Sequence, residues 1–291
     1  MTNKTILITG GTGTFGQVCV EELLKTDVHK IIVFSRDEKK QWDMQQRIKD
    51  LRVRFFIGDV RDRDRLYQAF KNVDYVIHAA ALKQVPALEY NPMEAIKTNI
   101  IGTQNVITCA VDLGVHKVLV LSTDKAVNPI NLYGATKLCA EKLTISSSAY
   151  GGRVTKLSVV RYGNVLGSRG SVIEVFEKQK ESGILTVTDS RMTRFMITPI
   201  EAVAFVMKCL GDMQGGEIFV PRLNSIRIME LAHKTAPNCK TVFTGIRIGE
   251  KLHEVLISLN EFRYTEIQDD RFIIRPQTQP LNGDFKAYTS S

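Results

Sequence analysis

Short apolar runs alternate with longer helical patterns over roughly the first 160 residues of this chain, and this alternation constrains its fold more than any other feature. Most of the runs are almost continuously apolar, as is typical of strands that are covered on both faces. Strands that alternate with helices predict repeated β-α-β units and a parallel sheet. The predicted strands are Thr5–Ile8, Ile31–Phe34, Val53–Ile57, Tyr75–His78, Lys117–Leu121 and Leu157–Arg161.

Two helix starts can be predicted from local residues. Asn91-Pro92 indicates a helix that runs to about Leu113, because Asn is a favoured N-cap and Pro is favoured at the first helical position. Thr198-Pro-Ile-Glu predicts a capping box and a helix through about Leu210.

The regular alternation weakens after Gly163-Asn164. We therefore expect a first domain over residues 1–164, to which residues 198–220 return. Residues 165–291 are expected to form a smaller α/β domain that binds substrate and provides the second wall of a cleft.

Glycine residues follow the first predicted strand in a pattern that suits a dinucleotide. Gly10, Gly13 and Gly16 permit a tight turn, a close approach of the backbone to a pyrophosphate, and close packing of the next helix on the sheet. The helix N-terminus also favours phosphate. A purely structural turn is the alternative, but the β-α-β frame favours a doubly wound Rossmann domain. The loop residues expected at the cofactor are Gly10, Thr12, Gly13, Thr14, Phe15 and Gly16.

The charge at the end of the second strand distinguishes between the two nicotinamide dinucleotides. Enzymes that use NAD usually place an acidic residue there for the ribose 2′-hydroxyl. Here Ser35 is followed by Arg36, whose guanidinium suits a 2′-phosphate, with Lys39 or Lys40 nearby. A solvated charged turn is the alternative, because two acidic residues lie in the same segment. We predict NADP.

A tyrosine and a lysine four residues apart follow the fifth predicted strand. Tyr133 and Lys137 would share one face of a helix. A phenol has a pKa of about 10, so bringing it near 7 needs ~4 kcal/mol of differential stabilisation. An adjacent ammonium and a nicotinium charge can share that stabilisation. This spacing also occurs by chance, but together with the glycine loop and the preceding Ser122-Thr123 it predicts an acid–base unit.

Longer runs carry a resemblance to a known family. The glycine loop, Ser-Thr-Asp-Lys and Tyr-x-x-x-Lys, in this order, resemble the extended short-chain dehydrogenases that act on nucleotide sugars. The closer resemblance is to the inverting UDP-N-acetylglucosamine 4,6-dehydratases that begin pseudaminic acid biosynthesis in bacteria. The runs span most of the chain: Phe34-Ser-Arg-Asp-Glu, Ile57-Gly-Asp-Val-Arg-Asp, His78-Ala-Ala-Ala-Leu-Lys, Ser122-Thr-Asp-Lys-Ala-Val-Asn-Pro-Ile-Asn-Leu-Tyr-Gly-Ala-Thr-Lys, Arg161-Tyr-Gly-Asn-Val, Gly167-Ser-Arg-Gly-Ser, Arg191-Met-Thr-Arg-Phe and Gly249-Glu-Lys-Leu-His-Glu.

The resemblance implies a dehydration that regenerates a tightly bound NADP in each turnover. Oxidation at C4 of UDP-N-acetylglucosamine acidifies C5–H, water leaves from C6, and the hydride returns to C6. Inversion at C5 gives UDP-2-acetamido-2,6-dideoxy-4-keto-L-arabino-hexose. By resemblance, Tyr133 with Lys137 serves the C4 hydroxyl, Lys125 is the C5 base and Asp124 is the acid at C6. Thr123 belongs to the same catalytic set.

The resemblance also implies binding residues. Asp59 and Val60 correspond to a pair that meets the adenine, and Ala79, Ala80 and Ala81 provide small residues beside the cofactor, although packing alone would also explain the alanines. The residues expected at the substrate are Lys83, Thr123, Asn164, Arg169, Arg194, Arg247 and Glu250. Lys83 is expected to reach the cofactor as well. Surface exposure is the alternative for each arginine.

Two physical difficulties accompany these roles. A lysine base must be neutral, yet the reference pKa of lysine is ~10.4, and Asp124 beside Lys125 favours the charged form. Neighbours on a regular strand also point to opposite faces. Both side chains can therefore reach the sugar only if the strand has already turned into a loop. A structural salt bridge is the alternative role for Lys125.

Composition limits the remaining classes of function. The formal net charge is +8, but the basic residues are scattered, so small phosphorylated ligands are expected and nucleic acid is not. The five cysteines are far apart and never form C-x-x-C, which argues against a metal site and for a reduced, cytoplasmic location. No leader or membrane span is expected. A homo-oligomer is expected from the superfamily.

Three other functions stay open. A nucleotide-sugar C4 or C5 epimerase shares the oxidation step, although Tyr133 favours the dehydratase. The enzyme could also release the 5,6-unsaturated intermediate. A non-catalytic regulator that senses NADP is the alternative from another class, since fold alone does not define function.

Overall fold

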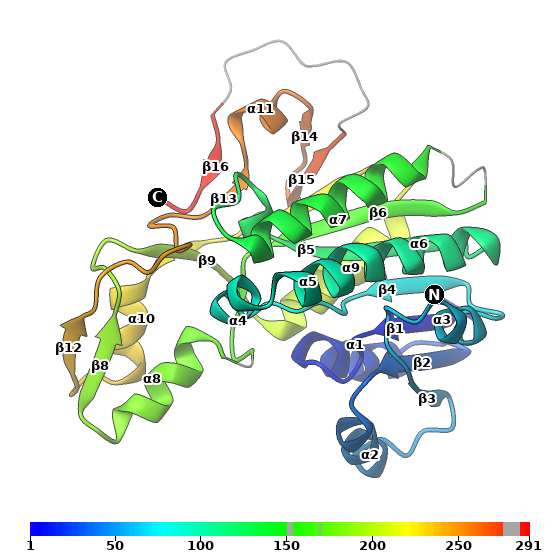
Figure 1. Ribbon diagram of the computed structural model, residues 1–291, viewed down its shortest axis with the longest axis horizontal. Coiled ribbons are helices and arrows are strands. Elements are labelled where there is room, and N and C mark those ends of the chain that lie inside the picture. The colour runs from blue at the N-terminus through cyan, green and yellow to red at the C-terminus, as the bar shows by residue number, and fades with distance from the viewer. Residues whose placement is uncertain (150–153, 169, 276–285) are drawn as a thin grey trace.

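A nine-stranded sheet forms the centre of the protein (Figure 1). The computed structural model describes residues 1–149, 154–168, 170–275 and 286–291. Across the sheet the strands are β14 (Thr265–Ile267), β15 (Arg271–Ile274), β10 (Ile218–Pro221), β6 (Lys156–Tyr162), β5 (Lys117–Thr123), β4 (Tyr75–His78), β1 (Thr5–Thr9), β2 (Lys30–Ser35) and β3 (Val53–Ile57). Neighbours from β3 to β10 are parallel, whereas β15 is antiparallel to both β10 and β14. The predicted α/β fold with a doubly wound parallel sheet is confirmed.

Helices cover both faces of the sheet because the strands are apolar on both sides. In β1, Leu7 packs into one core while Ile6 and Ile8 pack into the other. The helices that pack on the Ile6 side are α1 (Thr14–Leu24), α2 (Glu38–Arg47) and α9 (Pro199–Asp212). Those on the Leu7 side include α3 (Arg63–Ala69), α6 (Gly102–Asp112) and α7 (Leu132–Ser148). The predicted capping box of Thr198 and Glu201 opens α9.

The helix predicted from Pro92 contains a π-helical turn that local propensity did not reveal. It comprises α5 (Pro92–Ala95), the π-helix η1 (Ile96–Ile101) and α6, and it ends at Asp112. The short helix α4 (Val85–Tyr90) precedes it and packs on α7. Asn91 is the N-cap residue as predicted, but its side chain donates a hydrogen bond to the Ala87 carbonyl instead of capping the helix.

A smaller lobe lies beside the carboxyl end of the sheet, at the left of Figure 1. Its own core includes Phe176, Leu185, Met192 and Leu231. Its elements are α8 (Val172–Lys180), β8 (Ile184–Val187), α10 (Ile228–Thr235) and β12 (Lys240–Phe243), joined to the large lobe by β7 (Asn164–Val165), β9 (Thr193–Ile197), β11 (Ser225–Arg227) and the antiparallel pair β13 (Val255–Ile257) and β16 (Tyr288–Thr289).

The division predicted at residue 164 differs from the sheet in one respect. Residues 265–274 were assigned to the smaller domain, yet β14 and β15 extend the large sheet beyond β10. β15 can pair there because β10 offers a free edge and because β15 is apolar on both faces. Phe272 of β15 packs into one core and Ile273 into the other. The domain boundaries themselves stay a prediction.

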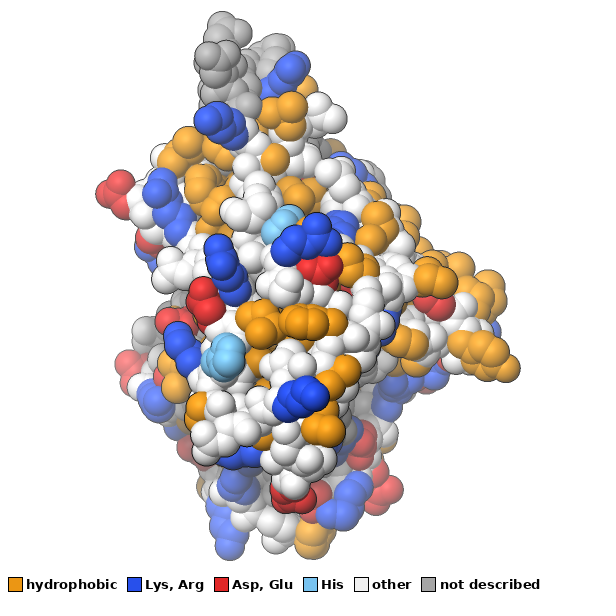
Figure 2. All heavy atoms as spheres, turned by 90° about the vertical axis from the view of Figure 1, so that its left-hand side faces the viewer, with side chains coloured by type: hydrophobic (Ala, Val, Ile, Leu, Met, Phe, Trp, Pro, Cys, Tyr) orange, Lys and Arg blue, Asp and Glu red, His pale blue; other side chains and the backbone are white. Residues whose placement is uncertain are grey.

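The surface of the smaller lobe carries charges of both signs. Figure 2 turns this lobe toward the viewer and shows Lys and Arg side chains in separate places among acidic and apolar ones. Within the described part of the chain, no helix is long and apolar enough to cross a membrane.

Candidate active site

The loop between β1 and α1 lies at the carboxyl edge of the sheet, against the segment that follows β4. Gly10 has a φ of 68°, and a Cβ at this position would lie 2.9 Å from the Ala80 Cα. A Cβ on Gly16 would lie 2.5 Å from the Gly11 Cα, so α1 can start directly beneath the turn only with glycine there. Gly13 is the N-cap of α1 and has no side chain to cap it, which leaves N–H groups for a bound anion.

A cavity of about 640 Å³ opens beside this loop, where the strand order reverses between β1 and β4. All the predicted cofactor residues except Lys39 line it: Gly10, Thr12, Gly13, Thr14, Phe15, Gly16, Ser35, Arg36, Asp59, Val60, Ala79, Ala80, Ala81, Lys83, Tyr133 and Lys137. The glycine turn, the row of small alanines and the basic residue after β2 together fit an extended, phosphate-bearing dinucleotide.

The basic residues after β2 do not all face this cavity. Arg36 lines it, with its Nη1 3.5 Å from Asp59 Oδ2. Lys40 lines it as well and pairs with Asp37 at 2.6 Å. The predicted cofactor residue Lys39 is instead 76% exposed and pairs with Asp43 at 2.5 Å. Because α2 begins at Glu38, residues 39 and 40 point to different sides of a helix, and the structure places only the second at the cavity.

The chain turns immediately after β5, which brings three predicted catalytic residues together. Asp124 and Lys125 lie in a single 3-10 turn, η2 (Asp124–Ala126), so they no longer alternate across a strand. The Asp124 Oδ1 accepts hydrogen bonds from the Thr123 hydroxyl at 2.9 Å and the Lys125 ammonium at 3.0 Å. Thr123 and Lys125 line the cavity. Asp124 is buried behind them, and its Oδ2 has no hydrogen-bond partner among the described residues.

Tyr133 and Lys137 both line the cavity from α7, as their spacing predicted. Burial lowers the pKa of Lys137 to about 8, against the opposing effect of Glu141. The Lys137 ammonium donates a 2.6 Å hydrogen bond to the Leu121 carbonyl. Burial raises the pKa of Tyr133, and the cation that opposes this rise is Lys125. The sequence had suggested Lys137 for that role.

Gly134 explains how α7 comes so close to the turn η2. A Cβ on this residue would lie 2.1 Å from the Lys125 carbonyl oxygen. Asn131 caps α7 by accepting a hydrogen bond from the Gly134 N–H at 2.8 Å. The glycine next to Tyr133 therefore sets the distance between α7 and η2.

The predicted substrate residues fall into two groups. Lys83 and Asn164 line the cavity: the Lys83 ammonium is 3.4 Å from the Ser168 hydroxyl, and Asn164 Oδ1 is 3.5 Å from Lys125 Nζ. Burial, followed by the charge of Lys125, lowers the pKa of Lys83. Arg169 lies outside the described residues.

The second group does not line this cavity. Arg194 is buried, and its guanidinium donates to the carbonyls of Thr193, Lys251 and Leu252 at 2.7–3.0 Å. Arg247 is exposed and lies 3.3 Å from Glu250, which is 3.7 Å from Arg194. These contacts give Arg194 and Glu250 structural partners that their spacing in the sequence did not reveal.

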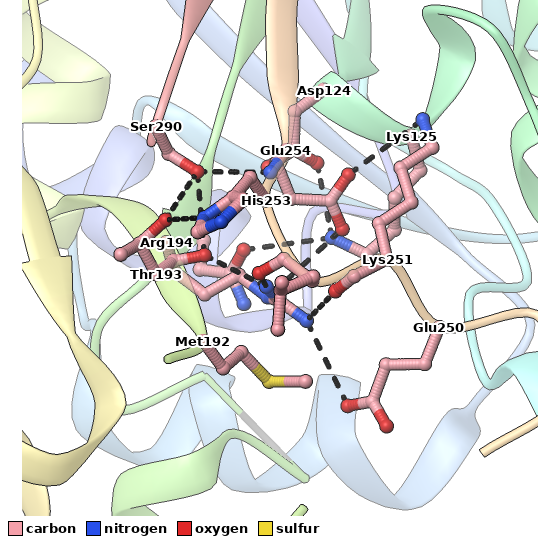
Figure 3. Close-up of polar contacts among 12 residues, drawn as sticks. Asp124, Lys125, Met192, Thr193, Arg194, Glu250, Lys251, His253, Glu254 and Ser290 are labelled. Carbon is pink, nitrogen blue, oxygen red and sulfur yellow. Dashed lines mark hydrogen bonds and ion pairs between the residues drawn. The ribbon is translucent and has the colours of Figure 1, made fainter. Parts of the chain in front are cut away.

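Sequence reasoning missed two charged groups that form an ion-pair cluster with Lys125. Glu254 is buried with its Oε1 3.4 Å from Lys125 Nζ, and Lys251 lies 3.8 Å from Glu254 Oε2 (Figure 3). Both belong to the run Gly249-Glu-Lys-Leu-His-Glu, where only Glu250 had been assigned a role. Thr98, on η1, also lines the cavity, and its buried hydroxyl has no hydrogen-bond partner in the described part of the chain.

Known proteins resemble this chain over nearly its whole length. A family model described as "Polysaccharide biosynthesis protein" matches residues 6–276. A UDP-N-acetylglucosamine 4,6-dehydratase (inverting) of Campylobacter jejuni subsp. jejuni is 50% identical over 285 residues, which cover 97% of this chain and 85% of that protein. A UDP-glucose 4-epimerase of Rickettsia bellii is 44% identical over 290 residues, 96% and 85% of the two chains. The X-ray structure of Pen from Bacillus thuringiensis has a TM-score of 0.94 and 39% identity, covering 99% and 92%.

Proposed function

Because the chain belongs to the polysaccharide biosynthesis protein family, we propose that it dehydrates UDP-N-acetylglucosamine at C4–C6 with inversion at C5 and uses NADP. The observation that carries the proposal is the turn after β5. It presents Lys125 beside the cavity that the glycine loop opens, with Thr123 and Tyr133 next to it. By resemblance, these are the groups that an inverting dehydratase places around its sugar.

The cofactor is assigned to the cavity between the glycine loop and the segment after β4. Gly10 and the three alanines leave room for a pyrophosphate close to the backbone. Arg36 is the residue that would hold a 2′-phosphate. When bound, the nicotinamide supplies a hydride acceptor for C4 and a hydride donor for C6.

The Asp124–Lys125 pair offers a solution to the difficulty of a charged lysine base. Burial favours the neutral amine, but the carboxylates of Asp124 and Glu254 outweigh it and raise the pKa of Lys125. Transfer of one proton from Lys125 to Asp124, across 3.0 Å, leaves an amine and a carboxylic acid. The amine then takes the proton from C5, and the acid gives its proton to the departing C6 hydroxyl. Inversion requires that the proton which returns to C5 arrive on the opposite face of the ring, because return from Lys125 would restore the original configuration. This proton comes from solvent, and Lys125 and Asp124 end the cycle as the ammonium and the carboxylate with which they began.

Thr123 connects this pair to Tyr133. Its hydroxyl donates to Asp124 Oδ1 at 2.9 Å, and it also hydrogen-bonds to Tyr133. Tyr133 accepts the C4 hydroxyl proton as a phenolate and must release one proton before the next turnover, which balances the proton that C5 takes from solvent. We assign Thr123 to the path of that released proton.

The experiment is proton NMR of the purified protein with UDP-N-acetylglucosamine in D₂O. We expect a new C6 methyl signal, deuterium at C5 and an inverted configuration. Lys125→Ala should abolish C5 exchange; normal exchange in this variant would contradict the role of Lys125. A vinyl signal at C6 would indicate release of the unsaturated intermediate. No change in the spectrum would exclude this substrate.

A nucleotide-sugar 4-epimerase is the second candidate, since the R. bellii relative carries that name. Epimerisation needs the C4 oxidation but no acid at C6. Incubation with UDP-glucose separates the two functions: a new galactose-type H4 signal without a methyl signal would favour the epimerase.

We also propose that the protein forms a homo-oligomer. Support comes from exposed apolar side chains on consecutive helices, Tyr90 on α4, Met93 on α5 and Ile101 on η1. Light scattering coupled to size-exclusion chromatography measures the mass. A single-chain mass at micromolar concentration would contradict this proposal.

A further inference from the structure

Glu254 is a buried carboxylate beside Lys125 that none of the proposed steps uses. Its side chain is 3% exposed, and its Oε1 lies 3.4 Å from Lys125 Nζ. Asp124 Oδ1 lies 3.0 Å from the same nitrogen. Two carboxylates from distant parts of the chain therefore hold one ammonium at the wall of the cavity.

We propose that Glu254 is the positioning residue of Lys125, holding its side chain at the cavity and keeping it an ammonium in the resting enzyme. The inference rests on the proposed function only in that Lys125 is the C5 base of that reaction. The contact itself is a property of the fold.

Glu254 is also the carboxylate on which three cations converge (Figure 3). Lys125 lies 3.4 Å, Lys251 3.8 Å and Arg194 3.9 Å from its oxygens. Like charges this close disfavour one another unless an anion lies between them. Charged and titratable groups from every element around Lys125 belong to this environment: Asp124, Glu254, Arg194, Lys251, Lys83 and Tyr133.

The geometry around Glu254 suits an electrostatic role better than a packing role. Its Oε2 is buried and has no hydrogen-bond partner among the described residues. A buried carboxylate oxygen that lacks a hydrogen bond is costly, and neighbouring cations compensate for this cost here. An apolar side chain of similar size would fill the same space without that cost.

The C-terminal segment fixes the backbone of Glu254. Its N–H donates to the Ser290 hydroxyl at 2.8 Å, and its carbonyl accepts from the Ser290 N–H at 2.8 Å. The same hydroxyl contacts the Thr193 hydroxyl at 2.9 Å. Ser290 thus ties Glu254 to β9, so the end of the chain contributes to the position of Lys125.

Chemical labelling of the full-length enzyme tests the proposal without turnover. Wild type, Glu254→Gln and Glu254→Asp are treated with dilute acetic anhydride at about pH 8, and acetylation of each lysine is followed by peptide mass spectrometry. Only the neutral amine reacts. We expect the glutamine variant to raise the Lys125 rate about tenfold or more, because losing an opposite charge at this distance lowers an amine pKa by roughly one unit or more.

The comparison of variants separates charge from shape. Gln keeps the shape of Glu, whereas Asp keeps its charge and should leave the rate within about twofold of wild type. Glu230→Gln, at an exposed position of α10, should also leave the rate within about twofold. If Glu254→Gln does not fold, Ser290→Ala replaces it and should raise the rate, while Ser291→Ala should not. Equal Lys125 rates in wild type and Glu254→Gln, or equal increases in the Gln and Asp variants, would overturn the proposal.

Turnover provides a second readout. If wild type exchanges C5 of UDP-N-acetylglucosamine, the acid limb of its pH profile should move to lower pH in Glu254→Gln, because less base is needed to release the Lys125 proton. If wild type shows no exchange, the proposed function fails, yet the labelling result still decides the contact between Glu254 and Lys125.

Discussion

Two adjacent lysines show how strongly the surroundings of a residue control its role. Lys39 and Lys40 have the same chemistry, but the first pairs with Asp43 in solvent and the second lines the cavity. Arg36, a few residues earlier in the sequence, also lines the cavity. Its positive charge is only partly neutralised, because its Nη1 lies 3.5 Å from Asp59 Oδ2. The proposed specificity for a 2′-phosphate therefore rests on Arg36.

Replacing Arg36 should separate the two dinucleotides. In cofactor-free enzyme, Arg36→Ala should weaken NADP⁺ about ten- to a hundredfold, because a hydrogen bond to a charged group contributes about 1.5–3 kcal/mol. NAD⁺ affinity should change little, and Lys39→Ala serves as the matched control. Titration calorimetry measures both. Equal losses for the two dinucleotides would show that Arg36 does not read the 2′-phosphate.

Lys137 should make stability depend on pH in the alkaline range. Its pKa is lowered to about 8 by burial, compared with ~10.4 for lysine in an unfolded chain. Between these values the unfolded chain binds a proton that the folded chain has released, so the free energy of unfolding rises with pH. Below about pH 8 both states are protonated, and burying the ammonium costs stability.

Urea unfolding of wild type and Lys137→Met at about pH 7.5 and 9.5 measures this effect. The stability of wild type relative to the variant should increase at the higher pH. Lys39→Met, at an exposed site, should show the same difference from wild type at both values. A difference for Lys137→Met that stays constant with pH would mean that this amine titrates normally.

At the scale of elements, close approaches of backbone decide where the catalytic groups lie. The turn η2 follows β5 directly, and α7 reaches it because Gly134 has no side chain. The π-helix η1 presents Thr98 to the cavity while Asn99 donates to the Leu82 carbonyl and the Thr136 hydroxyl. Single π turns inside helices are frequent at functional sites.

Gly134→Ala should separate α7 from η2. The added methyl would meet the Lys125 carbonyl, and overpacking of this kind costs about 1–3 kcal/mol. Catalytic activity should fall as well, because Lys125 and Tyr133 would move apart. Gly211→Ala, on α9, is the control. No atom lies within 4 Å of the added Cβ, so the free energy of unfolding should rise by about 0.5–1 kcal/mol. Equal melting temperatures for wild type and Gly134→Ala would disprove the steric argument.

At the scale of the whole molecule, a buried ion network connects the sheet to the C-terminal region. Arg161 on β6 is fully buried, 2.7 Å from Glu141 on α7 and 2.9 Å from Glu261 on α11 (Leu259–Phe262). Glu141 also accepts a hydrogen bond from Ser122, which lies two residues before the first residue of η2. The network thus joins β5, β6, α7 and α11 in one polar cluster.

Breaking this network should destabilise the entire fold. Arg161→Met would leave two carboxylates without their cation, and removing one partner of a buried pair costs about 3–5 kcal/mol. Lys208→Met removes the cation of the exposed pair Lys208–Asp270 and should cost only about 0–1 kcal/mol. Urea denaturation compares them. Losses of similar size would show that burial does not govern the strength of these pairs.

Local periodicity determined much of this protein from sequence alone. Alternating apolar runs predicted six strands of the sheet to within two residues, because burial on both faces leaves a pattern that needs no knowledge of neighbours. The glycine loop and the four-residue spacing of Tyr133 and Lys137 also predicted cavity residues, because each pattern involves only residues that are close together in the sequence. The turn chemistry of Asn91-Pro92 and Thr198-Pro located two helix starts.

Only the tertiary structure decided which distant charges meet. The charge of Lys125 opposes the rise in the pKa of Tyr133, and the second carboxylate at Lys125 is Glu254. Strand β15 adds to the edge of β10, which no local pattern predicted. Such contacts depend on how the C-terminal third of the chain folds back over the sheet. Coulomb interactions act through space, so spacing along the chain cannot predict them.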